Sequence, residues 1–336
     1  MSCSPDAADW VALGPPALLE MLVPLRDEHA RSGGARLVEG GLGDVGKIAR
    51  SLAGERSVLL LVGEAGGRQQ FTSPFQETGD GEAMLGWLPL EGPQLADYVE
   101  RSVAILRRRE AERAVVLLAP REDRYLALLD EAVRGAELDN ARLFRWSAER
   151  IRRTPLAAAL RLGASAILYS GHGNATGWFA YGGLAAGHLA GGAPWRSHQS
   201  SALLFSLSCH TGAGGGSRRS FAEELVALGV AGAALAPLGD TLHENSRLLA
   251  RALVDAIGRG RQSLPEILAD ARSAGASLDG YAVIGDPLLG VASAEGAATR
   301  GACVFAPAAD AEDLAALRQA CERAAASLAA RAPLTN

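Results

Sequence analysis

Two residues whose side chains can perform nucleophilic chemistry follow two apolar runs of this sequence. The run at residues 166–169 is followed by Ser-Gly-His172-Gly173, and the run at residues 202–207 by Ser-Cys209. A cysteine thiol is mostly protonated at neutral pH, whereas its thiolate is a strong nucleophile, so a neighbouring imidazole that takes the proton supplies the activation. His172 and Cys209 are therefore the candidate base and nucleophile.

Both apolar runs have the composition of strands that are buried in a parallel sheet. Such strands are apolar on both faces, and open α/β sheets place their chemistry just beyond the carboxyl ends of the strands. We therefore expect His172 and Cys209 at one edge of a sheet, where the backbone N–H groups of Gly173 and Cys209 can form an oxyanion hole. The competing interpretation is structural, with Cys209 as a buried thiol and His172 as a turn residue.

The segments around these residues alternate between strand and helix, which predicts a mostly parallel sheet with helices on both faces. The expected strands are residues 35–39, 57–62, 114–119 and 141–146, and the expected helices are residues 16–30, 44–52, 93–109, 124–133 and 148–162. Residues 63–93 are rich in Gly, Glu and Pro and are predicted to form a loop or hairpin excursion.

The length of 336 residues exceeds that of a usual single domain. We expect an N-terminal α/β region at residues 1–112, packed on or continuous with a catalytic unit at residues 113–292. A C-terminal helical tail at residues 293–336 follows, with an Ala-rich helix at residues 311–330.

Composition excludes several other classes of function. The net charge of −5 gives no reason to expect nucleic acid as a partner, and no apolar stretch approaches the ~20 residues that span a bilayer. The N-terminus lacks the basic flank of a signal peptide, so a cytoplasmic location is expected. The four cysteines show no Cys-x-x-Cys spacing, which argues against a disulfide framework or a zinc ribbon. We expect no cofactor and no metal.

The order of these motifs resembles that of the caspase-like (clan CD) cysteine peptidases, with the CHAT branch and the gingipain family as the most similar groups. Ser-Gly-His172-Gly and Ser-Cys209-His look like their His-Gly and Ser/Ala-Cys motifs. Residues 225–233 are similar to the helix and strand that follow the cysteine, and Gly-Asp286-Pro is similar to the end of their last strand. The Gln-Ala-Cys-x-Gly signature of true caspases is absent.

The resemblance implies a caspase-like three-layer sandwich and a cysteine endopeptidase that cleaves one or few protein substrates in a regulatory or defence pathway, with an activating partner protein. In the gingipain branch, the loop after the first catalytic strand carries the acid that binds a substrate arginine. Asp123 matches this acid by position, and a carboxylate is the natural partner of a guanidinium group. The alternative is that Asp123 caps the helix that follows it. Trp178 lies in an aromatic-rich insertion that we expect to form a substrate wall.

Three other interpretations stay open. The first is a catalytically silent caspase-like scaffold that keeps the motifs without a reactive thiol. The second is a nucleotide-binding regulatory domain, because residues 41–47 fit G-x-x-x-x-G-K, although Ile48 stands where a phosphate loop has Ser or Thr. The third is a metal site made of Cys209 with His188, His198 and His210, although their spacing resembles no known zinc arrangement.

Overall fold

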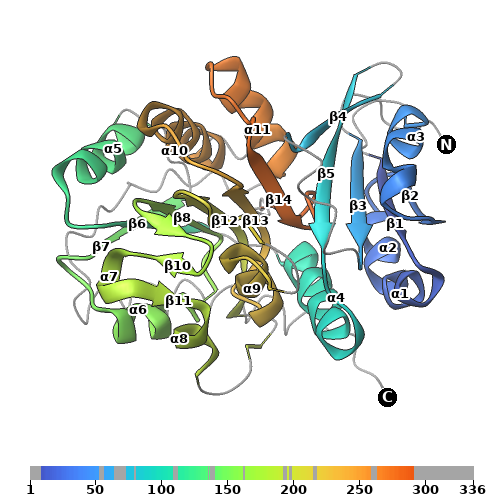
Figure 1. Cartoon of the computed structure of the whole chain (residues 1–336), viewed down its shortest axis with the longest axis horizontal. Coiled ribbons are helices and arrows are strands. Elements are labelled where there is room, and N and C mark those ends of the chain that lie inside the picture. The colour runs from blue at the N-terminus through green and yellow to red at the C-terminus, as the bar shows by residue number, and fades with distance from the viewer. Residues whose placement is uncertain are drawn as a thin grey trace.

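A computed structural model describes residues 9–52, 57–63, 73–78, 81–108, 113–134, 136, 141–161, 163–191, 195–196, 199–214, 218–258 and 263–290. Its central element is an eleven-stranded sheet (Figure 1). The spatial order is β2-β1-β3-β5-β14-β13-β12-β8-β6-β7, with β4 paired to β5. The strands are β1 (Trp10–Gly14), β2 (Ala35–Glu39), β3 (Val58–Val62), β4 (Phe75–Glu77), β5 (Glu82–Leu88), β6 (Arg113–Ala119), β7 (Ala141–Ser147), β8 (Ala166–Ser170), β12 (Ser201–Leu207), β13 (Ala231–Pro237) and β14 (Tyr281–Gly285).

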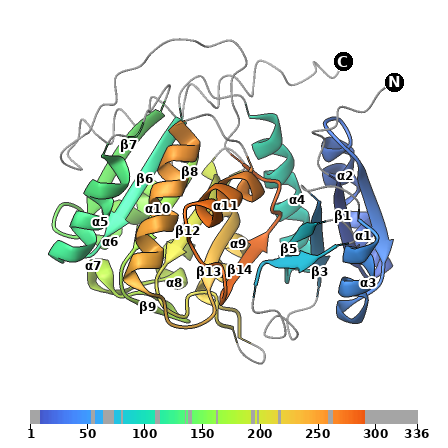
Figure 2. The ribbon, with the colours of Figure 1, turned by 90° about the horizontal axis from the view of Figure 1, so that it is seen from above.

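Helices cover both faces of this sheet, and the sheet is mostly parallel, as predicted. Among the described strands of this sheet, the pairs β4–β5 and β13–β14 are antiparallel and the others are parallel. Helices α5, α10 and α11 lie on one face and α1, α2, α4, α6 and α9 on the other (Figures 1 and 2). The helices are α1 (Pro16–Met21), α2 (Val23–His29), α3 (Val45–Arg50), α4 (Gly92–Arg107), α5 (Asp123–Val133), α6 (Arg153–Leu160), α9 (Phe221–Leu228), α10 (His243–Gly258) and α11 (Leu264–Ser273).

A small three-stranded sheet is inserted between β8 and β12. It has the order β11-β10-β9 and carries two short helices. Its elements are β9 (Gly173–Asn174), β10 (Gly177–Trp178), α7 (Ala180–Gly183), β11 (Leu184–Ala185) and α8 (Ala186–Ala190).

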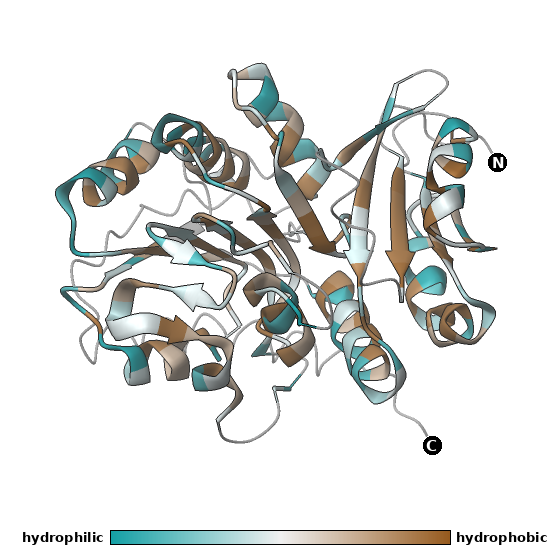
Figure 3. Cartoon of the chain, in the orientation of Figure 1, coloured by the Kyte–Doolittle hydropathy of each residue, from teal (hydrophilic) through white to brown (hydrophobic). Residues whose placement is uncertain are grey.

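The core lies on both faces of the central strands. Every residue of β3, β8, β12 and β13 is buried, which explains why these segments read as continuous apolar runs. Figure 3 shows the central strands largely in brown and the outer helix faces in teal. No helix among the described residues is long and apolar enough to cross a membrane.

The segment at residues 82–88, predicted to belong to a loop or hairpin excursion, is instead the buried strand β5. Gly86 explains the difference, because a Cβ atom there would lie 2.5 Å from the carbonyl oxygen of Gly285 and 2.5 Å from Pro287 Cδ. The glycine that reads locally as a loop residue therefore permits the close approach of β5 and β14.

Two further elements differ from the sequence-based expectation. Strand β1 (Trp10–Gly14) was not predicted. The helix expected at residues 16–30 is divided at Leu22 into α1 and α2, with Pro24 at the start of α2, where the missing N–H of proline costs little. The tail at residues 293–336, with Cys303 and Cys321, lies outside the described residues.

Strand β14 joins the two halves of the sheet, and the residue after it fixes the junction. Asp286 is fully buried, and its carboxylate lies 2.6 Å from His29 Nε2 and accepts a hydrogen bond from Trp10 Nε1 at 3.1 Å. The backbone N–H of Asp286 donates to Tyr98 Oη at 2.7 Å. Burial, together with the charge of Asp286, raises the pKa of Tyr98, so this phenol stays neutral.

We predict that Asp286→Ala lowers the free energy of unfolding by about 3–5 kcal/mol, because it leaves buried donors without their acceptor. Urea unfolding measures this change. Asp279→Ala, at an exposed carboxylate of the loop before β14, is the matched control and stays within about 0.5 kcal/mol of the wild type. Equal stability of Asp286→Ala and the control would contradict the role of Asp286 at the junction.

Candidate active site

The register of two neighbouring strands places His172 beside Cys209. Strands β8 and β12 pair in parallel, and Ser170 lies opposite Leu207. Each strand is followed after one further residue by a residue with a reactive side chain, His172 after β8 and Cys209 after β12. The two residues therefore occupy equivalent positions at the carboxyl edge of the sheet, where α/β folds place their sites.

Gly173 begins the inserted hairpin and packs against the loop that contains the cysteine. A Cβ atom at Gly173 would lie 2.7 Å from Ser208 Oγ, so a larger residue would separate the two loops. The N–H of Phe179 donates to the carbonyl oxygen of His172 at 3.0 Å. The next pair, Gly173 and Trp178, is consequently the non-hydrogen-bonded pair of this antiparallel ladder, and the Gly173 N–H points away from β10.

The Cys209 sulfur is half-buried and is held in place by one neighbouring residue. The Thr241 N–H donates to Cys209 Sγ at 3.5 Å, and Thr241 Oγ1 lies 3.7 Å from the same sulfur. His210 adopts the left-handed region at φ 59° and turns the chain directly after the nucleophile. Its Nε2 lies 3.0 Å from Asp240 Oδ1, so this imidazole is engaged elsewhere.

The His172 imidazole is partly exposed and contacts three residues at the start of α5. Its Nε2 lies 2.6 Å from Arg124 Nη2 and 3.5 Å from Glu122 Oε2. The Tyr125 ring packs edge-on against it, with a centroid distance of 5.3 Å. Among the described residues no hydrogen bond joins His172 to Cys209, which is common in substrate-free enzymes.

Arg124 and Glu122 favour different tautomers of His172. A guanidinium group only donates, so the contact with Arg124 requires an unprotonated Nε2 and places the proton on Nδ1. A carboxylate only accepts, so the contact with Glu122 requires the proton on Nε2. The second arrangement leaves Nδ1 free to take a proton from a thiol.

Tyr125 lies between the groups of the site. Burial raises the pKa of this phenol; the positive charge of Arg124 opposes the increase, and Glu122 adds to it. The Tyr125 ring also contacts His243 at the start of α10, with a centroid distance of 5.6 Å. The first turns of α5 and α10 therefore form one wall of the site.

Sequence reasoning missed Glu122, although a signal for it was present. Glu122 follows β6, the strand next to β8, at the same carboxyl edge of the sheet. Asp123, the predicted acid for a substrate arginine, is the exposed first residue of α5. Glu122 occupies the N-cap position, so Asp123 is not the N-cap residue, and its side chain makes no hydrogen bond or ion pair with another described residue.

Trp178 does not form the expected substrate wall. Its side chain is only 1% exposed, and its Nε1 donates to Ser206 Oγ at 2.8 Å. Its ring stacks on the Tyr169 ring with a centroid distance of 4.3 Å, so it packs the hairpin onto β8. The exposed aromatic residue of this hairpin is the next one, Phe179, at 58%.

The alternative sites receive no support from the described residues. No group of three His, Cys, Asp or Glu side chains in this part of the chain could hold a metal ion. His188 Nδ1 accepts from the Ala185 N–H at 3.0 Å, and His198 lies outside the described residues. In the glycine-rich turn, the Asp44 carboxylate accepts from the Gly41 N–H at 3.1 Å and would repel a phosphate there.

Comparisons with solved structures show what this fold is similar to. The Arg-specific cysteine proteinase gingipain R (RgpB) aligns with a TM-score of 0.63 and 13% identity, over 85% of this chain and 78% of that chain. A complex of the pro- and mature domains of Porphyromonas gingivalis RgpB aligns with a TM-score of 0.62 and 14% identity, over 84% and 79%. A structure described only as a protease gives 0.65 and 13%, over 85% and 79%.

No curated protein matches the chain. The sequence model of peptidase family C25 matches residues 94–292, which is more than half of the chain and includes both His172 and Cys209. This match and the RgpB structures support the caspase-like clan CD resemblance on its gingipain side. They do not test the CHAT branch. The chain therefore belongs to peptidase family C25 and is a cysteine peptidase.

Proposed function

We propose that this peptidase is an endopeptidase with a Cys209–His172 dyad. The observation that supports this most strongly is the parallel pairing that sets Ser170 opposite Leu207 and so brings the two loops together. In the proposed reaction His172 takes the thiol proton, and Cys209 Sγ attacks the peptide carbonyl carbon. The tetrahedral intermediate expels the amine, which receives the proton from His172, and water then hydrolyses the thioester.

The oxyanion of the intermediate is proposed to lie between the N–H groups of Gly173 and Cys209. Two backbone donors at this place stabilise developing negative charge without moving during the reaction. The direction of the Gly173 N–H, away from β10, is consistent with this role. Glu122 is proposed to hold His172 in the tautomer that accepts the thiol proton.

The dyad predicts a specific pattern of covalent labelling and activity. Cys209→Ala lowers peptide hydrolysis by at least about 10³-fold, and His172→Ala lowers it by about 10²–10⁴-fold. A peptidyl ketone adds once to wild-type protein, at Cys209, as intact mass and peptide mapping show. His188→Ala, at an exposed histidine of the inserted segment, is the matched control and keeps the activity. A catalytically silent scaffold would instead show no adduct at Cys209 with any probe.

We further propose that the enzyme cleaves after arginine, with Asp123 as the acid that binds the guanidinium group. The matching structure named as Arg-specific motivates this proposal, together with the exposed carboxylate of Asp123 near the start of α5. A charge-assisted, bidentate contact gives arginine an advantage over a neutral side chain.

Loss of this charge predicts a change in specificity without a loss of the reactive thiol. Asp123→Asn lowers kcat/KM for peptides with arginine before the cleaved bond by about 10–100-fold, and leaves peptides with leucine unchanged. Steady-state kinetics with matched Arg and Leu peptides measure the ratio. An unaltered ratio of kcat/KM for the Arg peptide to kcat/KM for the Leu peptide would show that Asp123 does not bind the substrate arginine.

The contact between Arg124 and His172 predicts that Arg124 slows the enzyme, because it favours the tautomer that cannot take the thiol proton. Arg124→Ala raises kcat/KM by about two- to tenfold, the range expected for one exposed hydrogen bond. Arg121→Ala, an exposed arginine just before α5, is the control and has no effect. A fall in kcat/KM for Arg124→Ala would show that this arginine assists the reaction.

The biological setting is proposed from the sequence resemblance. We propose one or few protein substrates in the cytoplasm, in a regulatory or defence pathway, with an activating partner. The number of substrates is measured by identifying the new protein N-termini that appear in a lysate treated with the wild type but not in one treated with Cys209→Ala. Broad degradation would exclude the regulatory role.

A further inference from the structure

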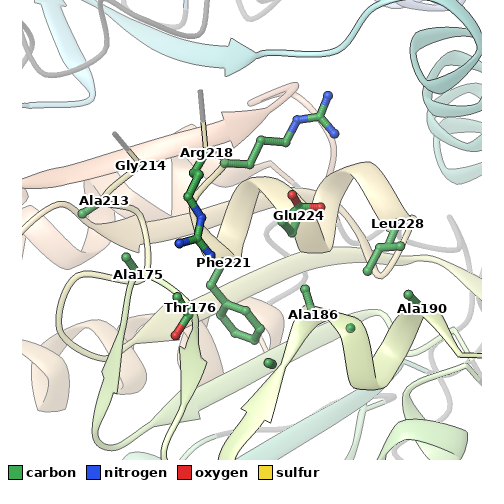
Figure 4. A pocket seen from close by; sticks show the side chains of 13 residues that line it. Ala175, Thr176, Ala186, Ala190, Ala213, Gly214, Arg218, Phe221, Glu224 and Leu228 are labelled. Carbon is green, nitrogen blue, oxygen red and sulfur yellow. The ribbon is translucent and has the colours of Figure 1, made fainter. Parts of the chain in front are cut away.

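A groove of about 810 Å³ lies beside the inserted hairpin, outside the dyad itself (Figure 4). Its walls come from the hairpin tip, from α8, from α9 and from the loop after Cys209. Small residues form much of it, and the larger side chains that line it come from α9 and the residues just before α9. They are Arg218, Arg219, Phe221, Glu224 and Leu228.

One end of the groove is formed by residues that follow the two catalytic loops closely in the chain. Ala175 and Thr176, at the hairpin tip, follow Gly173 by two and three residues, and Ala213 follows Cys209 by four residues. The Phe221 N–H donates to the carbonyl oxygen of Ala175 at 2.9 Å, so the N-terminal end of α9 is fixed against the hairpin.

The groove lies on the opposite side of the dyad from the wall formed by α5 and α10. Helices α8 and α9 cover the other face of the sheet in Figure 1. A polypeptide that crosses the dyad therefore has one half near α5 and the other half along α9. If Asp123 takes the residue before the cleaved bond, the groove takes the residues after it, so this inference rests on the proposed function.

Two of the charged side chains that line the groove, Arg218 and Glu224, lie at different positions along it. Arg218 lies at the end near the dyad and extends toward Phe221 and Thr176, whereas Glu224 lies further along α9 (Figure 4). Neither side chain makes a hydrogen bond or ion pair with another described residue. The neighbouring Arg219 also lines the groove, and its guanidinium group is engaged by Gln94 Oε1 at 2.8 Å and by the carbonyl oxygen of Pro89 at 3.3 Å.

The length of the groove matches a short extended peptide. Phe221 and Leu228 are the first and last residues of α9, which at about 1.5 Å per residue are about 10 Å apart. An extended chain covers this distance in about three residues. The Arg218 guanidinium group therefore meets the first residues after the cleaved bond. The Glu224 carboxylate meets residues about two positions later.

We propose that this groove binds the substrate segment after the cleaved bond and selects an acidic side chain, through Arg218, followed by a basic side chain, through Glu224. The small residues on its floor, such as Gly187 and Ala190, admit the backbone of the peptide. The site thus recognises the order of charges in the peptide and not its net charge.

Two labelled dodecapeptides of equal composition test this proposal. Both contain one arginine; one has Asp two residues after it and Lys four residues after it, and the other has the reverse order. Binding to the full chain carrying Cys209→Ala is measured by fluorescence anisotropy, so that no cleavage occurs. The acid-then-base peptide is expected to bind at least about threefold more tightly, as two exposed ion pairs allow.

The charge swap Arg218→Glu with Glu224→Arg is expected to reverse this preference. The matched control is Arg36→Glu with Glu39→Arg, two exposed residues on the distant edge strand β2, which keeps the wild-type preference. Equal affinities for the two peptides, or a preference that the swap in the groove does not change, would overturn the proposal. Because binding is measured without catalysis, failure of the proposed dyad would appear in the labelling of Cys209 and not here.

Discussion

The parallel pairing of β8 with β12 is the constraint on which the site depends. Both strands are fully buried, so each is held by packing on two faces, and a slip of one residue would exchange those faces. Such a slip would also move His172 by about 3.3 Å along the sheet relative to Cys209. The core therefore sets the relation between base and nucleophile, although neither side chain belongs to the core.

The neighbouring strands β6 and β13 position the other residues of the site. On one side β6 ends at the loop that supplies Glu122 and Arg124 to His172. On the other side β13 ends before the loop whose Thr241 holds the Cys209 sulfur. Strand β14 then pairs with β13 and connects this half of the sheet to the N-terminal half through the buried Asp286. The reactive groups of the site described here come from the half of the sheet that contains β6, β8 and β12.

Much of the fold, and the candidate dyad of His172 and Cys209, could be predicted from the sequence, because the buried strands of the sheet are recognisable from their composition. Buried parallel strands read as apolar runs, and the residues that follow them lie at one edge. The gingipain resemblance pointed to Asp123 in the loop after β6, but the neighbouring Glu122, whose carboxylate lies 3.5 Å from His172 Nε2, was not predicted. Which of two neighbouring side chains faces the site depends on the exact residue at which α5 begins. The sequence pattern does not determine a helix boundary to within one residue.

The errors have a common physical origin in contacts between distant segments. Gly86 reads as a loop residue until β14 is known to lie against it. Trp178 is expected on a substrate wall because it lies in an aromatic-rich insertion, whereas in the structure it is buried against Tyr169 and Ser206. In both cases a contact with another strand decides the environment of the residue, and local composition does not reveal that contact.

The most direct measurement is the crystal structure of the protein with a peptidyl ketone bound covalently to Cys209. We predict that the oxygen of the adduct lies about 3 Å from the N–H groups of both Gly173 and Cys209, with the His172 imidazole next to the sulfur. An adduct oxygen that points to solvent, or one held by His210 in place of Gly173, would contradict the assignment of the catalytic edge.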